Sequence, residues 1–290
     1  MPPLDRSLQV PFADALSRLA IDARATATAL TKTGFSEVDW IENFHALVAT
    51  NLAADLRARV RAQGQAVSVA VGTALVHGSP FRVTPNWGHG SSPSIEIGDL
   101  LFVGERHEVD GLKERQALLL QMKVGAVVLR SAAVSGPTRQ AALFAEWPPI
   151  TWSVTATCAG LPGPFPRTPS PGPCDAAQFG IIPDSAAGPS PDFDALPLIP
   201  GPAFGNPRPL LGEIARTLRL DLGIDATPGP RDGWPRIVED ILHVAPITPF
   251  RAGATRPARH PAAAAHRLHG AHRGRFVVVV VGFGGPGVLD

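Results

Sequence analysis

The chain has 290 residues and a formal net charge of +1, from 26 lysine and arginine residues against 25 acidic ones. This balance excludes a surface that is basic all over, so a polyanionic partner would have to bind a local patch. A hydrophobic fraction of 44% suits a globular protein, whereas 31 prolines and 29 glycines predict irregular stretches.

Cysteine usage and hydropathy indicate a cytoplasmic protein without membrane association. Two cysteines, Cys158 and Cys174, are too few for a disulfide framework. Residues 1–18 mix charged with apolar residues and lack the apolar block of a signal peptide. The most apolar run, residues 276–283, is far shorter than the roughly 20 residues that span a bilayer.

The first clear element is a helix expected from Ser36 to Arg61. Its apolar residues, including Ile41, Val48 and Leu52, recur three and four apart and therefore share one face. Ser36 stands three residues before Asp39, as in a capping box, and Gly64 would end the helix.

Three strands should follow this helix. Residues 66–76 alternate β-branched residues and lead into the turn 77–80, and residues 95–103 and 116–129 are the next two strands. A charged link, residues 105–115, is expected between the last two. A helix over 138–146 and a short strand over 150–155 complete an order that predicts an α/β or α+β sheet with the first helix on one face.

The remaining sequence differs in composition. Of the 49 residues from 161 to 209, 14 are proline, which predicts a surface wrap or linker because proline removes a backbone donor. Two helices are expected over 210–222 and 234–244, and a flexible basic tail follows. We divide the chain into an N-terminal helical segment (1–34), a core (35–160), a proline-rich wrap or linker (161–209), and a C-terminal helical extension with a basic tail (210–290).

Two neighbouring apolar strands carry the polar residues of most interest. Asp99 interrupts the strand 95–103, where an unpaired buried carboxylate would be strongly unfavourable. Gln121 and Lys123, two apart in the next strand, must point to the same face. The alternatives are a strand-end acid for Asp99, which follows Gly98, and the solvent-facing stripe of an edge strand for Gln121 and Lys123.

Such a set of residues suits phosphodiester hydrolysis. A hard cation such as Mg²⁺ prefers oxygen ligands and lowers the pKa of an attacking water. Asp99 offers a carboxylate and Gln121 an amide oxygen, while the ammonium of Lys123 can orient the water and offset negative charge.

In this placement the residues resemble the PD-(D/E)XK nuclease superfamily, in the Mrr-like variant with a Gln-x-Lys motif. The resemblance covers roughly residues 35–155 and implies a restriction-endonuclease-like central mixed sheet flanked by helices, followed here by a proline-rich and helical C-terminal extension. It also implies an acidic residue on the first helix, Glu42 or, less favoured, Glu37, that binds Mg²⁺ or Mn²⁺ together with Asp99 and Gln121. All four, with Lys123, are the expected catalytic residues.

The implied function is hydrolysis of DNA, with RNA as an alternative substrate, in antiviral defence against foreign DNA. Candidate nucleic-acid contacts are His77, Arg106, Lys113, Arg115, Arg130 and Arg139. The C-terminal extension is expected to serve a homodimer or an activating partner protein. The alternative is a catalytically inactive module of this kind that binds nucleic acid or a partner protein, since Gln121 is neutral. A small-molecule α/β enzyme has no nucleophile motif or phosphate loop to support it.

Overall fold

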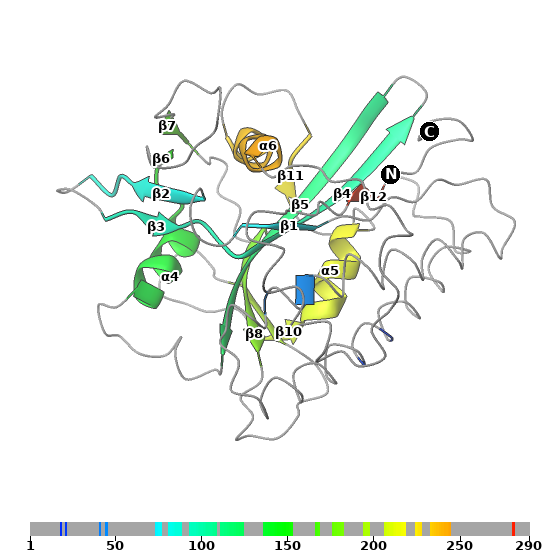
Figure 1. Cartoon of the computed structure of the whole chain (residues 1–290), viewed down its shortest axis with the longest axis horizontal. Coiled ribbons are helices and arrows are strands. Elements are labelled where there is room, and N and C mark those ends of the chain that lie inside the picture. Colours follow the sequence, from blue (N-terminus) through cyan, green and yellow to red (C-terminus); the bar gives the residue numbers. More distant parts are fainter. Residues whose placement is uncertain are drawn as a thin grey trace, which may run out of the picture.

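The computed structural model describes residues 18, 21, 41, 44–45, 73–76, 81–88, 93–108, 111–124, 136–152, 166–168, 176–182, 194–197, 206–218, 224–227, 233–244 and 280–281. This part of the chain has mixed α/β structure built around two sheets (Figure 1). None of its helices is both long and apolar enough to cross a membrane.

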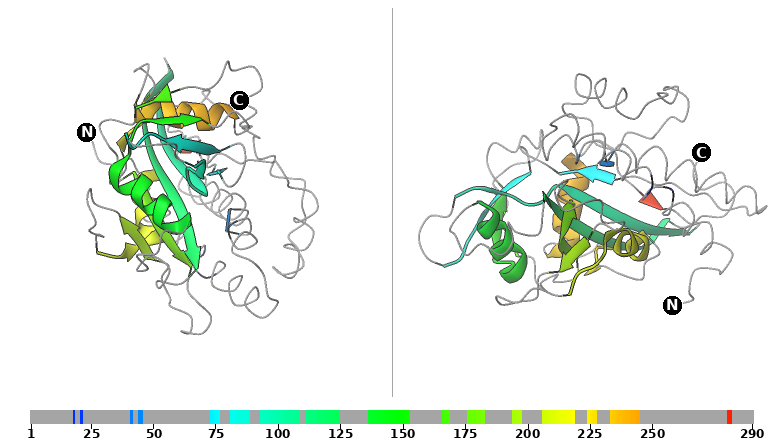
Figure 2. Two further views of the ribbon diagram at one scale, coloured as in Figure 1. Left: turned by 90° about the vertical axis from the view of Figure 1, so that its left-hand side faces the viewer. Right: turned by 90° about the horizontal axis from the view of Figure 1, so that it is seen from below.

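The larger sheet is built on a long antiparallel hairpin of β4 (Leu100–Glu108) and β5 (Gly111–Val124), seen from further sides in Figure 2. The strand β1 (Thr73–Leu75) pairs antiparallel with β4, and β8 (Ala177–Ile182) pairs parallel with β5. The remaining strands extend this sheet: β9 (Asp194–Pro197) pairs with β8, β10 (Arg208–Pro209) with β9, β11 (Ile224–Asp225) with β5, and β12 (Val280–Val281) with β4. The sheet is therefore mixed, with β5 paired to β4, β8 and β11.

The smaller sheet is antiparallel and has the order β3 (Ile95–Glu96), β2 (Arg82–Pro85), β6 (Ile150–Trp152), β7 (Pro166–Arg167). The helix α4 (Gly136–Glu146) lies beside it, at the left of Figure 1. Only residues 97–99 separate β3 from β4, so this short connection joins the two sheets.

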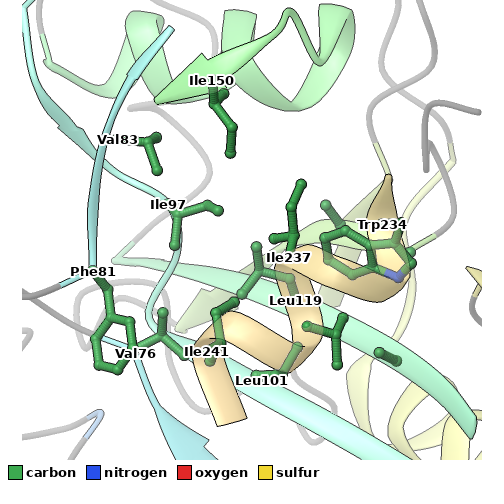
Figure 3. Packing of buried hydrophobic residues seen from close by; sticks show 14 of the residues in the cluster. Val76, Phe81, Val83, Ile97, Leu101, Leu119, Ile150, Trp234, Ile237 and Ile241 are labelled. Carbon is green, nitrogen blue, oxygen red and sulfur yellow. The ribbon is translucent and has the colours of Figure 1, made fainter. Parts of the chain in front are cut away.

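Two helices lie on opposite sides of β4 and β5 (Figure 1). On one side, Trp234, Ile237 and Ile241 of α6 (Trp234–Val244) belong to a buried cluster with Leu101 and Leu119 (Figure 3). Fully burying an aliphatic side chain of this kind contributes about 1.5–3 kcal/mol, so this cluster is the main support of the fold.

The opposite side is covered by α5 (Leu210–Leu218). A Cβ added to Gly180 would clash with Met122 Sδ and lie 3.5 Å from Leu210 Cδ2, which shows how closely β8, β5 and α5 pack there. Since side chains alternate along a strand, Met122 and Gln121 point to opposite faces of the sheet.

Several sequence expectations agree with the described residues. The helices expected over 138–146 and 234–244 correspond to α4 and α6, and the expected helix 210–222 corresponds to the shorter α5. Ile41, Phe44 and His45 are helical and buried, which fits the buried face of the expected first helix.

The strand expected over 95–103 is in fact two strands in different sheets, broken at residues 97–99. The link expected over 105–115 is also corrected, because β4 continues to Glu108 and β5 begins at Gly111. The register places Glu105 opposite Arg115 and Arg106 opposite Glu114. These charged residues therefore belong to the hairpin and not to a loop.

The proline-rich stretch also contributes more than a surface wrap. Ala176 to Ile182 contain no proline, and β8 lies there, paired with β5 in the larger sheet. Ala176, Ala177 and Phe179 are fully buried. Averaging proline over 49 residues concealed this proline-free core strand.

Candidate functional site

Asp99 and Gln121 form a completely buried polar pair in the larger sheet. The Nε2 group of Gln121 donates a hydrogen bond to Asp99 Oδ2, and the backbone N–H of Met122 donates to the same oxygen at 2.7 Å. The backbone of Asp99 is also held, since its N–H donates to Leu120 O at 2.7 Å and its carbonyl accepts from Val76 N at 2.7 Å. The carboxylate is thus held by β5, and the Asp99 backbone lies between β5 and Val76, the residue after β1.

Local sequence explains why Asp99 reaches this position. A Cβ added to Gly98 would lie 2.7 Å from Leu119 Cδ1 and 2.9 Å from Leu119 Cγ, so only glycine allows this close approach. Leu100 pairs with Leu120, which places the preceding Asp99 opposite Gln121.

Lys123 extends the polar pair along β5. It is partly exposed and, two residues beyond Gln121, lies on the same face of the strand. The solvent-facing alternative is wrong for Gln121, which is completely buried. The pairing of β5 with β4 ends at Leu120, whereas β8 pairs with β5 as far as Val124, so Lys123 lies beyond the β4 pairing and is partly exposed. Asp99 does precede its strand, as the other alternative expected, but it lies in the core and not in a surface turn.

The oxygen of the Gln121 amide is significant for metal binding. Among the described residues, Gln121 Oε1 is buried and has no hydrogen-bond partner. A buried acceptor without a donor costs about 1–3 kcal/mol, so this atom would gain from any cation or donor that reached it. Turning the amide over would bring Oε1 to the Asp99 carboxylate and place two oxygen ligands together.

Asp99 and Gln121 meet part of the requirement for a divalent-cation site. Carboxylate and amide oxygens suit Mg²⁺ or Mn²⁺. Within the described ranges, no group of three or more His, Cys, Asp or Glu side chains is placed to hold a metal. Glu42 and Glu37, the expected third ligands, lie outside those ranges.

Of the expected nucleic-acid contacts, four lie on described elements. Arg139 is exposed on α4, and Arg115 precedes Gln121 on β5 by six residues, or about 20 Å at the usual rise of a strand. Arg106 and Lys113 belong to β4 and β5, whereas His77 and Arg130 lie outside the described residues.

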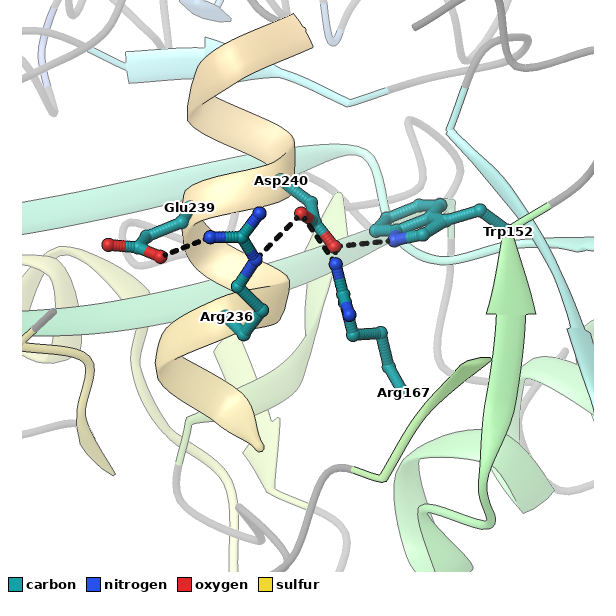
Figure 4. Close-up of polar contacts among 5 residues, drawn as sticks. All are labelled: Trp152, Arg167, Arg236, Glu239 and Asp240. Atoms are coloured by element: carbon teal, nitrogen blue, oxygen red, sulfur yellow. Dashed lines mark hydrogen bonds and ion pairs between the residues drawn. The ribbon is translucent and has the colours of Figure 1, made fainter. Parts of the chain in front are cut away.

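A first cluster that the sequence analysis did not single out surrounds Asp240 on α6 (Figure 4). Its carboxylate is 3% exposed and accepts hydrogen bonds from Trp152 Nε1 at 2.9 Å and from Arg167 Nε and Nη2 at 2.7 and 3.1 Å. Arg236 Nε lies 3.3 Å from Asp240 Oδ1, and Arg236 Nη1 lies 3.1 Å from Glu239 Oε2. The cluster ties β6 and β7 of the smaller sheet to α6.

A second such cluster surrounds Glu213 on α5. The carboxylate contacts Arg208 Nη1 at 3.3 Å and Arg216 Nη1 at 3.2 Å, and it accepts a hydrogen bond from Gln178 Nε2 at 3.1 Å.

One feature of the sequence could have identified both Asp240 and Glu213 as members of polar clusters. Asp240 adjoins Ile241, and Glu213 adjoins Ile214, on the apolar face of a predicted helix, where an acid needs a partner.

Comparison with known proteins identifies no relative of the chain. The chain matches no protein-family profile, no curated protein and no solved structure.

Proposed function

We propose that the chain is a metal-dependent nuclease of the PD-(D/E)XK kind that hydrolyses phosphodiester bonds in DNA, with Asp99, Gln121 and Lys123 as its catalytic residues. The observation that carries the proposal is the buried contact of Gln121 with Asp99, with Lys123 on the same face of β5. It joins residues 22 positions apart, Asp99 directly before β4 and Gln121 on β5.

The arrangement of strands supports the same proposal. The antiparallel strands β1, β4 and β5 are followed along the chain by α4 and by β8, which returns parallel to β5. A mixed sheet with helices on both sides supports the restriction-endonuclease-like fold that belongs to this proposal. In this proposal, the smaller sheet is formed by segments that are added to that fold, β2 and β3 before β4, and β6 and β7 after α4.

Each residue has a distinct chemical role in this proposal. A bound Mg²⁺ or Mn²⁺ would neutralise the phosphate and lower the pKa of the attacking water. Asp99 and Gln121 would hold the ion through oxygen atoms, with Glu42 or Glu37 as the proposed third ligand. Lys123 would orient the water and stabilise negative charge at the phosphate through its ammonium group. Because Asp99 and Gln121 are fully buried, the substrate would approach from the partly exposed Lys123 end.

Incubation of the full chain with plasmid DNA and Mn²⁺ or Mg²⁺ tests the proposal. We expect cleavage by the wild type and a loss of about 100-fold or more in Lys123→Gln, the range for a group that assists proton transfer. Arg236→Gln, a half-exposed cation of α6, is the matched control and should retain wild-type activity. Equal cleavage by all three proteins would reject the assignment of Lys123.

One observation favours a second function, that of an inactive module that binds nucleic acid. The Asp99 carboxylate already accepts two N–H donors, from Gln121 and Met122, so it is satisfied without a cation. Under this alternative, the full chain would bind a fluorescent DNA duplex in an anisotropy titration but would cleave it with no divalent metal.

A further inference from the structure

The Glu213 cluster has an unusual balance of charge. Glu213 is buried, with a side chain 4% exposed, whereas Arg208 and Arg216 are 42% and 41% exposed. Each arginine contacts a different oxygen of the one carboxylate, Arg216 at Oε1 and Arg208 at Oε2. Among the side chains that the structure describes, two positive charges therefore share one negative charge, which leaves a surplus of one positive charge in this cluster.

The Asp240 cluster provides an internal comparison. There, Arg167 and Arg236 face two carboxylates, those of Asp240 and Glu239, so the charges balance. Arg236 is 38% exposed, close to the values for Arg208 and Arg216. The two clusters thus present similarly exposed arginines that differ in whether their charge is neutralised.

Hydrogen bonds from Gln178 and Thr217 fix the position of Glu213. Gln178, fully buried on β8, donates to Oε2, and the Thr217 hydroxyl donates to the Glu213 carbonyl at 3.0 Å. Because both guanidinium groups are held on this anchored carboxylate, they are brought close together before any ligand arrives. Such preorganisation lowers the entropic cost of binding.

Both guanidinium groups keep donors for a ligand. Each has five N–H groups, and in each only Nη1 contacts Glu213. The planar fork of arginine matches the oxygens of a phosphate group, with two parallel hydrogen bonds. The carboxylate does not repel such a ligand strongly, because a guanidinium covers each of its oxygens.

We propose that Arg208 and Arg216, held by Glu213, form a binding site for a phosphate group. The surplus positive charge and the remaining donors define the ligand by its chemistry, which a free phosphate or a nucleic-acid backbone can supply. The site lies on β10 and α5, on the other face of the sheet from Gln121, and it does not depend on the proposed nuclease activity.

The test is a pair of calorimetric titrations of the full chain, one with inorganic phosphate and one with a short single-stranded oligonucleotide. Arg208→Gln and Arg216→Gln should each weaken binding about tenfold or more, as expected when a charged hydrogen bond is lost. Arg236→Gln should bind as the wild type does. Arg208→Lys keeps the positive charge but lacks the planar guanidinium fork. Its binding affinity should lie between those of the wild type and Arg208→Gln.

The outcomes separate the ligand sources. Arginine-dependent binding of phosphate assigns a free phosphate group, and arginine-dependent binding of the oligonucleotide alone assigns a nucleic-acid backbone. Thermal unfolding of each variant checks that the fold is retained, and Arg208→Lys covers the case in which Arg208→Gln is unstable. The proposal is overturned if the wild type binds neither ligand, or if Arg236→Gln weakens binding as much as Arg208→Gln and Arg216→Gln do.

Discussion

Asp99 and Gln121 face each other where the connection from the smaller sheet enters β4, and the Gln121 side chain donates a hydrogen bond to the Asp99 carboxylate. The pair is enclosed completely, and the same carboxylate oxygen also receives the backbone N–H of Met122. A buried carboxylate in this position affects both stability and the proposed chemistry, and the two effects are separable by experiment.

Asp99→Asn should lower the free energy of unfolding by about 1–3 kcal/mol, because asparagine replaces one acceptor oxygen with a donor amide next to the Gln121 amide. Urea denaturation of the metal-free chain measures this change. Asp225→Asn is the matched control, since Asp225 is exposed and, among the described residues, accepts the N–H of Thr227 at 2.8 Å. Equal effects of the two substitutions would contradict the account of Asp99.

Gln121→Glu should destabilise the metal-free chain, because two buried carboxylates would then repel each other. Under the proposed metal site, Mn²⁺ should raise the melting temperature of this variant by more than it raises that of the wild type, since the added ligand is an anion. Thermal unfolding with and without Mn²⁺ measures the difference. An identical response of the two proteins to Mn²⁺ would argue against a cation at this pair.

Gly98→Ala should destabilise the chain by about 1–3 kcal/mol, because the new Cβ would lie 2.7 Å from Leu119 Cδ1 and the core must shift. Gly98→Ala combined with Leu119→Ala should cost less than the sum of the two single substitutions, because the shorter side chain relieves the clash. Gly212→Ala is the control: its Cβ would meet only Pro209 Cβ, at 3.8 Å, and alanine favours a helix. Additive single effects would contradict the predicted close contact.

Asp240→Asn should destabilise the chain by about 3 kcal/mol or more, because it leaves the largely buried Arg167, 11% exposed, without its carboxylate. Glu239→Gln, one residue away on the same helix, removes a contact between partly exposed groups and should cost less than about 1 kcal/mol. Chemical denaturation of both variants gives the comparison. A similar cost for the two would show that the Asp240 cluster does not hold the smaller sheet to α6.

The sequence predicted the elements whose pattern is local. The helix α6 has apolar residues at Trp234, Ile237, Val238 and Ile241, a complete buried face, and its bounds were predicted correctly. The pairing of Asp99 with Gln121 also followed from local facts, namely the polar positions in two successive apolar strands and their alternation.

Relationships that depend on distant parts of the chain could not be predicted in this way. The position of β8 beside β5 is set by long-range pairing, and nothing within residues 177–182 specifies that partner. Likewise, the acid at position 240 indicates a need for a cation on the apolar face of a helix, but the sequence does not say that Arg167 supplies it. The break at residues 97–99 was missed because Ile97 continues the apolar pattern through a change of sheet.

The most direct test of the central claim is a Mn²⁺ titration of the full chain, followed by electron paramagnetic resonance of the free ion. The account predicts saturable binding of Mn²⁺ by the wild type that is lost in Asp99→Asn and retained in Asp225→Asn. Binding of equal stoichiometry and affinity in all three proteins would contradict a metal site at Asp99 and Gln121.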